Sequence, residues 1–348
     1  MSAAQPHPVP DRRRRTTTPP PLHLGRRHHL LTAGFDDDEI RHGLRNTTMT
    51  RLGHGLYTAG VPDDPIRETL RAITGDGVHV VSHHTAAALH GFALPWAKPG
   101  PTWRREDPGV TEAAGRSTTL TPPFHVTRID GIKPMIRHRL VVGHQVPIPP
   151  EHLVERDGIL LTSPAWTLSD LAHRRGPLEL LILADQLVRH PRTEFGDFGF
   201  HGDGTALTSP SELQEVAGLR RGVRGVRALR EAAALTRVGA DSPRKTELRY
   251  WMHRAGLPEF AVNAPIFDPD GRYLHTPDLS NEDFRVAVEY DGRGHADPRQ
   301  AERDVTRGER AADGEWLEVR LTDRHARPRF EPALNRIATA LTSRGWQG

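Results

Sequence analysis

Residues 284–291, FRVAVEYD, constrain the fold of this chain more than any other stretch. Apolar residues recur there at every second position, which is the spacing of one buried face of a β-strand. Glu289 and Asp291 fall on the opposite face, at the end of the same stretch. The pattern therefore predicts a strand that is packed on one side and carries two carboxylates on the other.

Helix and strand patterns flank this strand in a defined order. Residues 242–256 begin with Ser-Pro and stop at a glycine, which is typical of a capped helix. Further patterns predict strands at 260–267 and 273–279, a helix at 298–314, a strand at 316–321 and a last helix at about 332–344. The predicted order is αβββαβα, which matches the common core of the restriction-endonuclease-like fold.

Carboxylates gather near the ends of two successive predicted strands. Asp278 closes one strand and Glu289 lies on the next. Neighbouring strands lie ~4.8 Å apart, so acids at the same level converge if the two strands pair. Asp291 shares a face with Glu289. Clustered carboxylates repel one another unless a cation neutralises them, and oxygen ligands suit Mg²⁺ or Mn²⁺. We therefore expect Asp278, Glu289 and Asp291 to form a metal site.

Four more residues are candidates for the same chemistry. His295 follows the strand and suits a general base or acid at neutral pH. Glu247 borders the apolar stripe of the first helix, where it could bind metal through water. Asp304 and Arg307 share a helix face, and Arg307 could contact a phosphate. Taken singly, each residue also fits a structural role, because acids at strand ends usually meet solvent and Asp-Gly is a common turn. Their joint placement favours a site.

The same segments resemble a known family. TELRYWMHRAGLP, PDL, VAVEYDGRGH and DVTRGERAADGEWLEVRLT, in order over about residues 242–323, resemble Vsr-like (very-short-patch-repair) endonucleases, a domain-of-unknown-function type within the PD-(D/E)XK superfamily. The resemblance implies Mg²⁺-dependent phosphodiester cleavage by Glu247, Asp278, Glu289, Asp291 and His295, with Asp304 and Arg307 matching the family's Asp-x-x-Arg. The superfamily expects lysine where this chain has Asp291, which leaves the general base open.

The N-terminal part carries a second pattern. Residues 35–46 predict a capped helix, and residues 50–60 predict a strand or hairpin bent at its glycines, so residues 30–60 suggest a small winged-helix unit. RLGHGLYTAG, VSHHTAAALHGFALP and GILLTSPAWTLSDLA resemble AbiEi-like antitoxins. This resemblance implies DNA binding near Arg41, Arg45, Thr48 and Arg51, with a toxin or operator as possible partner. The alternative function is an antitoxin or transcriptional regulator whose nuclease fold is inactive.

Breaker-rich stretches divide the chain into several parts. The expected organisation is a disordered basic tail at 1–29, a winged-helix-like and helical unit at 30–96, a loop at 97–123, a middle α/β region at 124–190, a linker with helices at 191–241, and the restriction-endonuclease-like module at 242–348.

Composition excludes some classes of protein. No run approaches the ~20 apolar residues of a membrane helix, and the N-terminus lacks the apolar stretch of a secretory signal, so a cytoplasmic location is expected. The absence of cysteine excludes disulfides and thiolate zinc sites. Basicity is weak evidence for a nucleic-acid partner, because the net charge is only +3. An aromatic content of 6% disfavours a glycosidase with an aromatic-lined cleft.

Overall fold

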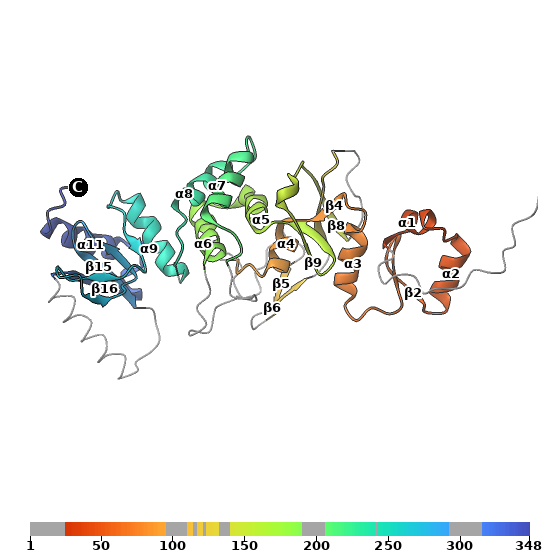
Figure 1. Ribbon diagram of the computed structural model, residues 1–348, viewed down its shortest axis with the longest axis horizontal. Coiled ribbons are helices and arrows are strands. Elements are labelled where there is room, and N and C mark those ends of the chain that lie inside the picture. Colours follow the sequence, from red (N-terminus) through yellow and green to blue (C-terminus); the bar gives the residue numbers. More distant parts are fainter. Residues whose placement is uncertain are drawn as a thin grey trace, which may run out of the picture. The chain divides into compact units, whose positions relative to one another are not determined.

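The computed structural model describes residues 25–94, 110–113, 117–120, 123–131, 140–189, 206–240, 242–291 and 315–348. The chain is a mixed α/β protein with helices and mixed sheets (Figure 1). It divides into two compact units, one of residues 1–81 with 121–161 and one of residues 82–120 with 162–348. Within the described ranges, no helix has the length and apolar character needed to cross a membrane.

The first unit begins with two helices and a hairpin. Its elements are β1 (Gly25–Arg26), α1 (Arg27–Thr32), α2 (Asp37–Arg45), β2 (Met49–Gly53) and β3 (Leu56–Ala59), with the strands in the order β1-β3-β2. Asp36 caps α2 by accepting hydrogen bonds from the amides of Asp38 and Glu39. The predicted helix and hairpin are confirmed. The structure also has β1 and the start of α1 inside the stretch expected as a tail, because Leu30 is buried against Ile40.

A five-stranded sheet forms the rest of the first unit. Its members are β4 (His79–Val81), β7 (Phe124–Arg128), β8 (Val141–Gln145), β9 (Leu153–Arg156) and β10 (Ile159–Thr162), in the order β8-β7-β4-β10-β9. Helix α3 (Pro65–Thr74) precedes the sheet and contributes the buried Ile73 to a cluster with Val126. The single-turn helix η1 (Pro150–His152) leads into β9.

Helices dominate the start of the second unit. They are α4 (His83–His90), α5 (Pro164–Leu171), η2 (Ala172–Arg174), α6 (Pro177–Val188), α7 (Pro210–Leu219), α8 (Val226–Leu235) and α9 (Pro243–Arg254). Helices α5, α7 and α9 each begin with proline after a serine whose hydroxyl accepts a first-turn amide, which is why they start where they do. The stretch expected as a loop contains a hairpin of β5 (Val110–Ala113) and β6 (Ser117–Leu120).

The C-terminal part of this unit contains a four-stranded sheet. Its strands are β11 (Ala261–Val262), β14 (Leu279–Asn281), β15 (Val286–Asp291) and β16 (Leu317–Thr322), in that order. The first two pairings are antiparallel and the third is parallel. Strands β12 (Ile266–Phe267) and β13 (Tyr273–His275) form a separate hairpin. The first two predicted strands each break in two at Pro265 and Pro277, since proline has no amide to donate to a ladder.

The two faces of the C-terminal sheet have different covers. On one face, Val288 and Leu321 are buried with residues of α9 and of α11 (Glu331–Ser343), such as Leu248 and Ile337. On the other face, Ala287 is buried with residues of the hairpin and with Trp316. Glu289 shares the second face with Ala287, because alternate residues of a strand point to the same side. The sheet therefore directs this acid away from the main core.

Candidate functional site

Asp278 lies at the junction between the hairpin and β14, and three parts of the second unit hold it. Its Oδ2 accepts a hydrogen bond from the amide of Tyr290 at 2.9 Å. Its carbonyl accepts one from the amide of Asn263 at 3.0 Å. Its Oδ1 forms an ion pair with the ammonium of Lys245, which belongs to α9. With 9% of its surface exposed, the residue is an almost buried, fixed carboxylate.

The strand register brings Asp278 and Glu289 to the same level of the sheet. Strands β14 and β15 pair Leu279 with Val288, and one further step along that register sets Asp278 opposite Glu289. The side chains nevertheless contact different groups. Asp278 contacts Lys245 and the amide of Tyr290, whereas Glu289 lies beside an imidazole. The two acids therefore lie at adjacent strand ends beside different neighbours.

His275 lies between two carboxylates on the second face of the sheet. Its Nε2 is 3.7 Å from Oε1 of Glu289 and 3.6 Å from Oε2 of Glu318. The side chain of Glu318 is 9% exposed, and its Oε1 accepts a hydrogen bond from Arg320. Its Oε2 is buried and accepts no hydrogen bond from the residues that the structure describes. The cluster thus brings one imidazole close to two carboxylates on the second face of the sheet.

Glu247 forms an ion pair within its own helix. Its Oε2 pairs with Arg244 at 2.7 Å, and its side chain is 25% exposed. It lies near Tyr290, whose hydroxyl donates a hydrogen bond to Asp323 at 2.7 Å. Burial raises the pKa of Tyr290, and the hydrogen bond and charge of Asp323 raise it further. Arg244 opposes this increase and Glu247 adds to it. Glu247 therefore belongs to the helix side of the sheet end.

Several candidates cannot be placed within the site. The backbone of Asp291 closes β15, where it pairs in register with Thr322. The side chain of Asp291 and the whole of His295, Asp304 and Arg307 lie outside the described residues.

The candidate DNA-binding residues of the first unit share one exposed region. Arg41, Arg45, Thr48 and Arg51 are exposed and follow one another from α2 through the turn into β2. Arg41 pairs with Asp38 at 2.8 Å, and the side chains of this pair are 65% and 81% exposed. Thr48 bonds Asn46 at 2.7 Å, and Arg51 donates to the carbonyl of Gly53 at 3.2 Å. The region offers several exposed guanidinium groups.

Sequence reasoning missed Lys245, His275 and Glu318. The composition could have drawn attention to Lys245, because only three of the 47 lysine and arginine residues are lysine. Glu318 has a signal in alternation, because it lies on the polar face of the strand at 317–322. His275 has no such signal, since its placement depends on how the hairpin folds back.

The donors present have the chemistry that a hard divalent cation requires. Asp278 and Glu289 offer carboxylate oxygens at one level of the sheet, and Glu318 adds a buried oxygen that accepts no hydrogen bond within the described part of the chain. Imidazole from His275 is a further ligand type that Mn²⁺ accepts. These donor types suit Mg²⁺ or Mn²⁺, but among the described residues Asp278, Glu289, Glu318 and His275 do not form a cluster whose ligand atoms all lie within 4.8 Å of one another.

Comparisons with known proteins supply no activity. No family model matches the chain, and no solved structure matches it. Two curated relatives, described as uncharacterized proteins from two strains of Mycobacterium tuberculosis, are 28% identical to it over 207 residues. The match covers 59% of this chain and 69% of each relative.

Proposed function

We propose that this is a cytoplasmic, DNA-associated protein whose C-terminal module is a Mg²⁺-dependent endonuclease of Vsr type. The observation that carries the proposal is the β14–β15 register, which sets Asp278 opposite Glu289 at adjacent strand ends. The order α9, antiparallel strands, parallel β16 and α11 supports a restriction-endonuclease-like module. The order of two helices and a hairpin supports a winged-helix-like unit at the N-terminus.

The residues of the module have distinct roles in this proposal. Asp278 and Glu289, with Asp291, hold the cation, which when bound polarises a phosphoryl oxygen and lowers the pKa of water. His275 lies beside Glu289, with its ring nitrogen 3.7 Å from that carboxylate, and would offset its charge when protonated. His295 remains the proposed general base or acid, and Arg307 the proposed phosphate contact. Asp304 supports that helix.

The test is cleavage by the full chain in Mg²⁺ and in Mn²⁺. Supercoiled, nicked, mismatched and single-stranded DNA are compared as substrates for the wild type and for the Asp278→Ala, Glu289→Ala double variant. The matched control replaces Glu282 and Asp283, two exposed acids at the other end of the same strand pair. We expect the site variant to lose cleavage and the control to retain it. Equal cleavage by all three proteins excludes this site.

The second candidate function is an antitoxin or transcriptional regulator with an inactive nuclease fold. The exposed series Arg41, Arg45, Thr48 and Arg51 favours it, because guanidinium groups supply the phosphate contacts of DNA-binding proteins. A toxin or an operator would then be the partner.

A gel-shift of the full chain on its own upstream DNA separates the two functions. Replacing Arg45 and Arg51 with alanine should weaken binding about tenfold and flatten its salt dependence, since two phosphate contacts are lost. Replacing the exposed Arg221 and Arg224 is the charge-matched control. Sequence-specific binding by a protein that neither binds metal nor cleaves DNA supports the regulator.

A further inference from the structure

Helix α9 delivers a lysine to the candidate site. Lys245 lies in the first turn of the helix, where its amide donates a hydrogen bond to the cap hydroxyl of Ser242 at 3.3 Å. Its ammonium reaches Oδ1 of Asp278, and the two side chains are 20% and 12% exposed. An ammonium has three protons to donate, and among the described residues Asp278 is its ion-pair partner. Protons therefore remain for a second acceptor.

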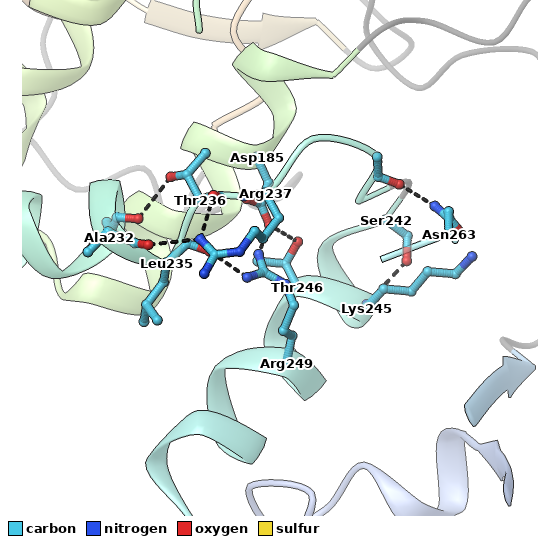
Figure 2. A network of polar contacts seen from close by, with 12 residues as sticks. Asp185, Ala232, Leu235, Thr236, Arg237, Ser242, Lys245, Thr246, Arg249 and Asn263 are labelled. Carbon is cyan, nitrogen blue, oxygen red and sulfur yellow. Dashed lines mark hydrogen bonds and ion pairs between the residues drawn. The ribbon is translucent and has the colours of Figure 1, made fainter. Parts of the chain in front are cut away.

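The other side of the same helix is fixed to α6 by a buried acid. Oδ2 of Asp185 accepts hydrogen bonds from the hydroxyl of Thr246 at 2.8 Å and from Arg249. Its Oδ1 accepts one from the amide of Arg237 at 2.9 Å. Figure 2 shows this network, with the side chain of Lys245 extending away from it. Lys245 directly precedes Thr246 in α9. Because Asp185 holds Thr246 in place, it also sets the direction in which the side chain of Lys245 leaves the helix.

We propose that Lys245 is the cationic residue of the Asp278–Glu289 site and that Asp185 is its positioning residue. The inference rests on the proposed phosphodiesterase function and adds a residue to it. The lysine stands on the helix, whereas the superfamily places one two residues after the second acid, where this chain has Asp291. The helical region before residue 242 then contributes to the site through α6, so the site is not confined to the C-terminal module.

Charge and chemistry give this lysine two opposite effects. Its ammonium shares a carboxylate with any bound divalent cation, so like-charge repulsion should weaken metal binding. The same ammonium faces the anionic phosphate of a substrate, so it should favour the charge that develops during cleavage. Loss of the amine should therefore tighten metal binding while it slows the reaction. If Lys245 has a purely structural role, loss of the amine should weaken metal binding and also slow cleavage.

The experiment uses the absence of cysteine from the chain. Lys245→Cys introduces a single thiol in the full-length protein. Alkylation with 2-bromoethylamine rebuilds an amine of nearly the original length, and iodoacetamide gives a neutral side chain as the control. Mn²⁺ affinity is measured by calorimetry and DNA cleavage by steady-state kinetics. Lys245→Arg, which keeps the charge, controls for folding.

We expect Lys245→Cys to cleave at least about tenfold more slowly and to bind Mn²⁺ several-fold more tightly. Aminoethylation should reverse both changes, and the neutral adduct should reverse neither. Asp185→Asn should likewise slow cleavage and tighten Mn²⁺ binding. The Lys245→Cys, Asp185→Asn double variant should cleave no more slowly than the slower single variant, because both residues act through one amine. Unchanged cleavage by Lys245→Cys, or equal rescue by both adducts, overturns the role of the lysine. Additive losses overturn the role of Asp185.

Failure of the proposed function has a separate signature. If the wild type binds Mn²⁺ but cuts no DNA, the endonuclease proposal is wrong. The change in Mn²⁺ affinity in Lys245→Cys then still decides whether Lys245 belongs to the metal site. If the wild type binds no Mn²⁺, both the endonuclease proposal and the role of Lys245 at a metal site are wrong.

Discussion

Helix α9 has an acid–base pair on each of two sides, and the two pairs differ in kind. Asp185 is 1% exposed and receives donors from a guanidinium, a hydroxyl and an amide. Asp278 is 9% exposed and receives an ammonium and one amide. Burial raises the pKa of Asp185, and the charge of Arg249 opposes that increase. The difference indicates that a buried acid with many donors holds structure, whereas an acid at a strand end with one flexible partner remains available for chemistry.

The largest expected effect tests this contrast directly. Asp185→Asn should lower the free energy of unfolding of the second unit by about 3 kcal/mol, because it leaves the charge of Arg249 buried beside a neutral group. Asp278→Asn should lower it by less than about 1 kcal/mol, since Lys245 can turn towards solvent. Urea unfolding followed by tryptophan fluorescence measures both. Equal losses would remove the distinction between a structural and an available acid.

A third acid, in the first unit, sharpens the comparison through pH. Asp76 pairs with His79 at 2.6 Å and with Arg26 at 3.4 Å. Burial alone would raise its pKa, but the hydrogen bond and charge of His79, the charge of Arg26 and the amide of Val78 outweigh burial and lower the pKa to about 2. Asp185 is shifted in the opposite direction. Ion pairing and hydrogen bonding therefore determine the direction of the pKa shift at Asp76, whereas loss of hydration determines it at Asp185.

Asp76→Asn should accordingly destabilise the first unit by about 2 kcal/mol near pH 6. Because the folded pKa lies below the ordinary value of 3.8, this contribution is present above about pH 4 and is lost as the pH falls towards 2. Urea titrations between pH 6 and pH 2 should show the wild type and variant converging at low pH. A difference that is constant with pH would mean that packing, not charge, holds Asp76.

The sequence predicted elements better than it predicted partners. Alternation in residues 286–291 fixed which face of β15 is buried, because the pattern depends on neighbouring residues alone. The predicted strand at 273–279 ran through Pro277, where the structure breaks it in two, and the pattern did not show that the hairpin would turn His275 towards Glu289. The contact of Lys245 with Asp278 joins residues 33 positions apart, as 278 − 245 gives. Such contacts depend on tertiary packing, which periodicity does not encode.

The choice between arginine and lysine gives the smallest and most specific prediction. Arg249 donates to Asp185 and to the carbonyl of Leu235 at once, which one compact ammonium cannot match in geometry. Arg249→Lys should therefore cost about 1 kcal/mol of unfolding free energy. Lys245→Arg should leave stability within about 0.5 kcal/mol, because its pair with Asp278 lies at a partly open edge. Urea unfolding of both variants measures the contrast. If the two exchanges have the same effect, geometry does not distinguish the pairs, and the functional assignment of Lys245 must rest on its chemistry alone.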